Sequence, residues 1–216
     1  DSGATLSFGA NDTFGNHSAT INVAMAIGGT VTNGGSWYNP LGPLTFHGGT
    51  LHATGGANAN FPAFALKGPV TALTGTVSTI SGAGINATYQ LGGHLVMGTA
   101  FDVQGTADLN VPAILQDGRA LNYGAQASIL TKDGTGTLTL GGINTYSGNT
   151  TVNAGTLVLA DNAQLRFAIG ATSGTNNQLA GAGTVTLDGD FAIDTAAAAA
   201  LTAGTWTLEA VTTLTG

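Results

Sequence analysis

The sequence has no cysteine, which excludes disulfide bonds, thiolate metal sites and cysteine nucleophiles. It also has little charge, because Asp, Glu, Lys and Arg make up 7% of the chain, against roughly 25% in an ordinary globular domain. Only four residues are Lys or Arg and the formal net charge is −7, so a surface for nucleic acid or anionic membranes is not expected. No run of 18 or more apolar residues occurs, so no transmembrane helix is expected.

What the chain does contain is glycine, with 35 residues, and a hydrophobic share of 43% that is enough for a core. Its apolar residues alternate with Thr, Asn, Ser, Ala or Asp in short runs that end at Gly. A period of two is typical of strands with one face inward and one outward. The apolar positions predicted to point inward are Ile21/Val23/Met25/Ile27, Leu44/Phe46, Leu95/Met97, Phe101/Val103, Leu109/Val111, Leu138/Leu140, Leu157/Leu159, Leu165/Phe167/Ile169, Val185/Leu187, Phe191/Ile193 and Trp206/Leu208.

A short Gly-Thr core recurs along the sequence, at Gly29, Gly49, Gly75, Gly136, Gly155, Gly183 and Gly204. Most intervals are about 20 to 28 residues, which is the length of one coil of a β-solenoid. A β-sandwich would also alternate, but it would not repeat one pentapeptide. At about 22 residues a coil, we predict roughly ten coils in a single solenoid over residues 1–216, with less regular coils in 1–125 and regular repeat coils in 126–216. The single helix candidate is Thr195–Ala203, which could also be a turn.

This composition agrees with a solenoid, because each strand of a parallel coil stacks on the same position of the next coil at about 4.8 Å. Thr and Asn bond well to copies of themselves, whereas stacked charges repel. Low charge, outward Thr and abundant Gly at corners are therefore expected together.

The segment LTKDGTGTLTLGGINTYSGNTTVNAGTLVL at 130–159 is more specific. It resembles the autotransporter-associated β-strand repeat, also named the passenger-associated transport repeat. The matching residues include Lys132, Gly134, Gly136, Asn144, Tyr146, Gly148, Thr150 and Gly155. Weaker similar units lie at 42–56, 99–111, 181–194 and 204–210. The resemblance implies a right-handed parallel β-helix in a secreted or cell-surface bacterial protein, and it carries no catalytic site. We expect the chain to be a fragment, a processed product or a protomer of something longer.

Few residues could bind a metal ion or take part in catalysis, and they are scattered along the sequence. His17, His47, His52 and His94 do not form a ligand set on their own, although His47 and His52 could meet across a turn. Asp188, Asp190 and Asp194 share one parity and could lie on one outer face, which would make Ca²⁺ the one conceivable cofactor. A solvated acidic face is the simpler interpretation, so we predict no metal, no cofactor and no catalytic residue.

Three further functions remain as alternatives. Trp37 and Tyr38, with Pro40 in a turn-rich stretch, could bind glycans as in an adhesin. Outward T-x-T pairs could form an ice-binding array, although uneven coil intervals argue against a strict lattice. A polysaccharide-active enzyme would need paired carboxylates, whereas Glu209, Arg119 and Arg166 lie apart.

We therefore expect a non-enzymatic structural protein of the bacterial cell surface or extracellular matrix, a stalk or fibre subunit. Its expected partners are further copies joined end to end, with a glycan or surface ligand as a possibility. No nucleic acid and no membrane insertion by this segment are expected.

Overall fold

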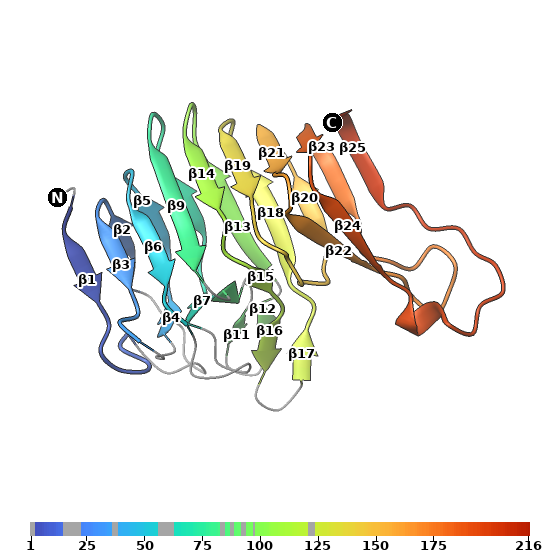
Figure 1. Ribbon diagram of the computed structural model, residues 1–216, viewed down its shortest axis with the longest axis horizontal. Coiled ribbons are helices and arrows are strands. Elements are labelled where there is room, and N and C mark those ends of the chain that lie inside the picture. The colour runs from blue at the N-terminus through green and yellow to red at the C-terminus, as the bar shows by residue number, and fades with distance from the viewer. Residues whose placement is uncertain are drawn as a thin grey trace.

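The computed structural model describes residues 3–14, 23–35, 39–55, 63–82, 85–86, 89–91, 94–96, 98–120 and 124–216. Over these residues the protein is a stack of short parallel strands wound into a three-sided β-solenoid (Figure 1). The predicted all-β parallel solenoid is confirmed. In every turn the chain passes along a first, a second and a third side and then enters the next turn.

The first side carries the longest ladder and runs along the whole solenoid (Figure 1). Each of its strands pairs in parallel with the strand of the next turn. The strands are β1 (Thr5–Ser7), β3 (Thr30–Thr32), β6 (Thr50–Ala53), β9 (Val77–Gly82), β14 (Asp108–Val111), β19 (Thr137–Leu140), β21 (Thr156–Leu159), the end of β23 (Leu179–Leu187) and the end of β25 (Glu209–Thr215).

The other two sides are made the same way. The second side consists of β4 (Asn39–Leu41), β7 (Phe64–Leu66), β10 (Ile85–Asn86), β15 (Leu115–Gln116), β22 (Gln164–Ala168) and β24 (Asp190–Asp194). The third side consists of β2 (Met25–Ile27), β5 (Leu44–Phe46), β8 (Val70–Ala72), β13 (Gly98–Val103), β18 (Ile129–Asp133), β20 (Thr150–Val152) and the beginnings of β23 and β25.

The number of turns is smaller than the ten predicted. The first side has nine strand levels, and six described turns place a strand on the second side, so there are about six complete three-sided turns. The reason is the length of a turn. Register partners Thr137 and Thr156 are 19 residues apart, whereas Thr79 and Asn110 are 31 residues apart, because loops lengthen many turns. At about 4.8 Å a level, the ladder is roughly 40 Å long.

The predicted inward alternation is confirmed in most strands. In β19 and β21 the inward residues Leu138, Leu140, Leu157 and Leu159 are buried, and the Thr residues between them face outward. Together with Phe46, Phe64, Phe101, Phe167 and their neighbours they form one continuous apolar core. Burying such columns is the main favourable contribution to stability, since apolar surface gains about 25 cal/mol per Å² removed from water.

Four details of the pattern are wrong. Val23, Phe191 and Ile193, predicted to point into the core, are 48%, 39% and 47% exposed. Trp206 and Leu208 lie in the irregular segment before β25, so Gly204 does not begin a strand. Thr79, rather than Thr76 after Gly75, stacks on Thr50. Pro40, expected in a turn, lies inside β4. The helix candidate reduces to a single 3₁₀ turn, η1 (Ala196–Ala198), and no helix among the described residues is long and apolar enough to cross a membrane.

Two corners of the solenoid differ strongly. Where the third side meets the first, the chain turns within a few Gly-rich residues, as at 134–136 and 153–155. We name this the glycine corner. The corner where the second side meets the third is named the loop corner. Several turns make long excursions there, whereas others pass it within a few residues, as at 42–43 and 67–69. Its excursions contain the hairpins β11–β12 (Tyr89–Leu91, His94–Val96) and β16–β17 (Gly118–Ala120, Gly124–Gln126), the 170–177 loop and the 195–208 segment with η1 (Figure 1).

Strand β23 continues around the glycine corner without ending. Leu179 pairs with Thr150 on the third side, and Thr184 pairs with Thr156 on the first. Its pairing with β25 shifts between Gly181 and Thr184, where the chain changes side.

Candidate functional site

Residues 130–159, the segment with the repeat motif, form one turn and the start of the next, and the glycine corners of this segment lie against neighbouring turns without spare room. Gly136 N donates to Val103 O at 2.8 Å, and Thr156 N donates to Gly136 O at 3.2 Å. A Cβ on Gly155 would lie 2.5 Å from Gly136 O, and Gly155 has a φ of +65°. Only glycine allows both the backbone approach and this dihedral angle.

Lys132 is a buried cation at the same corner. It occupies an inward position of β18, and its side chain is fully buried. Its Nζ donates to the carbonyl oxygens of Asp133 at 2.7 Å, Gly134 at 2.7 Å and Ala154 at 3.1 Å. The ammonium therefore satisfies backbone acceptors of two successive glycine corners, which would otherwise lie in a dry environment.

Two carboxylates lie outside this cation. Asp102 and Asp133 are register partners on adjacent strands, an arrangement that like charges alone would destabilise. Gln104 Nε2 donates to Asp102 and Asn153 Nδ2 to Asp133, each at 2.8 Å. Burial lowers the pKa of Lys132 to about 8, and the fields of Asp102 and Asp133 oppose that shift. The attraction of the two carboxylates therefore offsets part of the cost of burying the Lys132 cation.

The second half of the motif, residues 142–150, forms the hydrogen bonds that hold the second side of this turn in place. Asn144 is buried, accepts from Leu115 N at 3.0 Å and donates to Gly142 O at 2.9 Å. Tyr146 and Thr150 share a hydroxyl–hydroxyl bond of 2.6 Å, and burial raises the pKa of Tyr146. A Cβ on Gly148 would lie 2.1 Å from Ser128 O, so this position also requires close backbone approach.

Other turns use buried asparagine in the same way, and the sequence pattern did not identify these residues. Asn33 accepts from Thr54 N at 2.8 Å, one turn onward, and Asn39 donates to Ala10 O at 3.2 Å, one turn back. The signal that could have found them is the position of each Asn at the end or the start of a strand. Such bonds between turns satisfy the polar backbone groups that corners leave unpaired.

The loop corner is held by part-buried polar contacts of side chains. Asp117 accepts from Ser128 N at 2.8 Å and from Ser147 N at 2.9 Å, which anchors the 118–127 excursion. Arg166 forms an ion pair with Asp194, although no acidic partner lies near it in the sequence. The pKa of Asp194 is lowered, first by the hydrogen bond from Ala196 N and then by Arg166.

The predicted metal candidates are not brought together. Asp188 precedes the corner at Gly189, whereas Asp190 and Asp194 follow it in β24. The three carboxylates therefore do not share the single outer face that the sequence pattern allowed. His52 bonds to Ser81 Oγ at 2.9 Å, and His47 is exposed. Within the part of the chain that the structure describes, no group of three or more His, Asp or Glu could hold a metal ion.

Several candidates cannot be placed. His17, Ile21, Trp37, Tyr38 and Met97 lie outside the described residues. His94 lies in β12 and Arg119 in β16. Glu209, a candidate for enzyme chemistry, accepts a hydrogen bond from the backbone N of Val211.

The outward threonines form a more regular array than the sequence intervals indicated. Consecutive register partners on the first side give one column, Thr5, Thr30, Thr50, Thr79, Asn110, Thr139, Val158, Thr186 and Thr215. The uneven intervals do not disturb this column, because the extra residues leave the stack at other corners. The next outward positions on the same strands are Ser7, Thr32, His52 and Ser81, so the expectation that uneven coils do not form a strict lattice stays a prediction.

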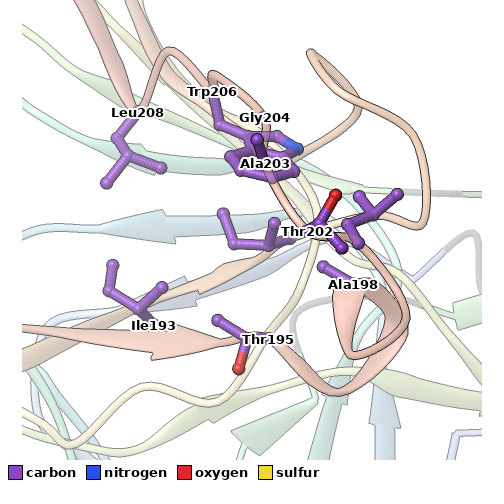
Figure 2. A pocket seen from close by; sticks show the side chains of 10 residues that line it. Ile193, Thr195, Ala198, Thr202, Ala203, Gly204, Trp206 and Leu208 are labelled. Carbon is purple, nitrogen blue, oxygen red and sulfur yellow. The ribbon is translucent and has the colours of Figure 1, made fainter.

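A pocket of about 450 Å³ lies beside β24, and its lining contains no titratable residue. Figure 2 shows Ile193, Thr195, Ala198, Trp206 and Leu208 around the opening. The Trp206 ring packs over Gly204, and its Nε1 donates to Thr172 O at 3.3 Å. An uncharged apolar lining suits an apolar side chain and offers no acid, base or metal ligand for catalysis.

Comparison with known proteins agrees with the turn just described. Residues 130–159 match the protein family described as "Passenger-associated-transport-repeat". No curated protein and no solved structure matches the chain. The match confirms, over these residues, the resemblance seen in the sequence.

Proposed function

We propose that this chain is a non-enzymatic structural segment of a bacterial surface or extracellular protein, a solenoid that holds its loop-corner excursions in fixed order. The observation that carries the proposal is the use of the motif residues. Lys132, Asn144, Tyr146 and Thr150 all bond within the stack, and the motif glycines permit close backbone approach. Residues used in this way support a continuous ladder rather than a reaction centre.

The arrangement of the loops supports the same role. In the described part of the chain, four excursions leave the solenoid at the loop corner, whereas the glycine corner stays short along the same turns. A rigid ladder with loops along one edge can present those loops while its own geometry stays fixed. The passenger-associated repeat supports a secreted or surface location.

Antibody raised against the purified chain tests this proposal on cells of the organism that produces it. We expect labelling of intact cells or of the culture medium, and loss of cell labelling after brief external protease treatment. Labelling that requires permeabilised cells would contradict a surface or extracellular role. A cytoplasmic protein of the same organism, probed in parallel, controls for lysis.

The threonine column favours one second candidate, binding to an ordered lattice such as ice. Its rungs repeat at about 4.8 Å, and outward residues of one strand are about 7 Å apart. Thermal hysteresis of the purified chain would support lattice binding if Thr139→Lys abolishes it. Thr151→Lys, on the third side, should leave the hysteresis unchanged. Absence of hysteresis in the unaltered chain would remove this candidate.

A further inference from the structure

The outward face of the first side changes its composition along the stack. From β19 onward, a second threonine column runs beside the column that contains Thr139. In the two turns before β19 the same position holds Val77 and Asp108, so the second column starts at Thr137. We name the two columns over β19, β21, β23 and β25 the threonine panel. Its members are Thr137, Thr139, Thr156, Val158, Thr184, Thr186, Thr213 and Thr215.

The threonine panel has a fixed spacing in two directions, because each member is the register partner of the next along its column (Figure 1). Successive rungs are about 4.8 Å apart and the two columns about 7 Å apart. The hydroxyls of Thr186 and Thr215 lie 3.0 Å from each other, so stacked hydroxyls point the same way. Threonine is branched at Cβ and stiff, so ordering these side chains against a partner costs little conformational entropy.

The panel is exposed because of the inward–outward alternation of its strands. Leu138, Leu157 and Val185, which lie between the panel residues, are buried in the core. A turn stacked before β19 or after β25 extends this face along the axis and does not cover it. The exposure of the panel therefore does not depend on what lies beyond either end of the ladder.

Charge and size together limit what the panel can bind. It contains no charged residue, and Asp108, one rung before Thr137, and Asp188, two residues after Thr186, lie at its border. A face without Lys or Arg does not suit phosphate groups or anionic lipids. Four rungs span about 14 Å by about 7 Å. That footprint is far smaller than the roughly 800 Å² that each partner buries in a stable protein complex. A neutral partner that repeats in two directions can instead contact every rung at once.

The earlier turns of the first side offer no such panel. Their second outward column lies on the opposite flank and contains Thr32, His52 and Ser81. Nδ1 of His52 and Oγ of Ser81 are 2.9 Å apart, so these two side chains bond to each other. An imidazole also interrupts the spacing of hydroxyl and methyl groups that the panel keeps.

We propose that the threonine panel is the surface through which this chain binds ice, and that the turns before β14 do not take part. The inference rests on the second candidate function and assigns it to particular residues. Each water fixed on a surface costs up to about 2 kcal/mol of entropy, and hydroxyls at a regular spacing compensate for it with hydrogen bonds. Val158 is the panel position without a hydroxyl, so it is a defect in the array.

Thermal hysteresis of the purified chain and three variants tests the proposal. Thr156→Lys places a long charged side chain in the middle of the panel and should abolish hysteresis. Thr50→Lys is the matched control, because Thr50 belongs to the same outward face in β6, and it should keep the hysteresis of the unaltered chain. Val158→Thr repairs the defect and should raise the hysteresis. Circular dichroism confirms the fold of each variant.

Equal loss of hysteresis in Thr156→Lys and Thr50→Lys would overturn the panel and leave ice binding by the whole first side standing. Full hysteresis in Thr156→Lys, or a value for Val158→Thr at or below that of the unaltered chain, would also overturn it. Absence of hysteresis in the unaltered chain removes the panel together with the second candidate function. The structural role is tested separately by labelling of cells and is unaffected by that result.

Discussion

The glycine corner and the loop corner perform the same task, since each turns the chain from one side of the solenoid to the next. At the glycine corner, backbones of successive turns are in direct contact and Lys132 bonds to carbonyls of two of them. At the loop corner, several turns leave the stack for long excursions held by half-buried pairs such as Arg166 and Asp194, whereas other turns stay short. The comparison shows that a corner residue is strictly constrained where its backbone contacts the neighbouring turns, and much less constrained where the chain leaves the stack.

The largest expected difference between the corners concerns added length. Insertion of Gly-Ser-Gly-Ser between Thr135 and Gly136 should prevent formation of the native ladder, because the corner has no room and both flanking strands are fixed in register. The same insertion between Thr202 and Ala203, both exposed, should cost less than about 1 kcal/mol, since lengthening a free loop is inexpensive.

Thermal melting followed by circular dichroism measures both insertions. A cooperative transition near that of the unaltered chain for the Thr135–Gly136 insertion would show that the glycine corner tolerates length as well as the loop corner does.

Glycine substitution separates close approach from backbone dihedral preference. Gly155→Ala should destabilise the fold by about 3–5 kcal/mol, because its Cβ would meet Gly136 O at 2.5 Å and its φ is +65°. Gly174→Ala at the loop corner also has a positive φ, +80°, but has nothing within 4 Å, so it should cost about 1 kcal/mol. Urea unfolding of the two variants gives the comparison, and equal losses would mean that dihedral strain alone accounts for both.

Removal of the buried cation is the next effect in size. Lys132→Met should lower stability at pH 7 by about 1–3 kcal/mol, because three carbonyl oxygens lose their donor in a dry corner. The difference from the unaltered chain should grow as pH rises above 8. The folded pKa of about 8 lies below the ordinary 10.5, so the folded protein releases its proton first and the penalty of the buried charge disappears.

Urea unfolding at pH 7, 8, 9 and 10 measures this pH dependence. Stability curves of Lys132→Met and the unaltered chain that run parallel over the whole range would contradict the assignment of the titration to Lys132.

The smallest effect belongs to the exposed ion pair at the loop corner. The folded pKa of Asp194 is lowered, so its stabilisation is present above pH 3.8 and is lost as pH falls through the folded value. Asp194→Asn should therefore lower the neutral stability slightly and leave the stability near pH 2 nearly unchanged, which flattens the acid side of the profile by the same small amount. Melting temperatures from pH 2 to 7 test this, and an unchanged acid limb would show that Arg166 and Ala196 do not hold the carboxylate in solution.

The sequence predicts the strands and the glycine corner well and the loop corner poorly. The alternation around Leu138 and Leu157 predicts the strands, and the Gly-Thr pairs at 136 and 155 predict the corner, because period two and close backbone approach both restrict residue type. The number of turns was overestimated, since excursions at the loop corner follow no period. The pairing of Arg166 with Asp194 was unpredictable for the same reason, as their 28-residue separation depends on one excursion length.

The sequence predicts only part of the polar contacts inside the stack. Lys132 and Asn144 belong to a recognisable motif, but the motif does not say that their partners are backbone groups of neighbouring turns. Asn33 and Asn39 have no such motif around them. Their role depends on which residue lies one turn away, and that distance is set by the fold.

Strand β23 has a mechanical consequence. Because one uninterrupted segment belongs to two sides at once, tension applied to β25 loads both ladders together and cannot peel one side from its neighbour. Force spectroscopy on this part of the chain should therefore record a single rupture event in place of two successive smaller ones.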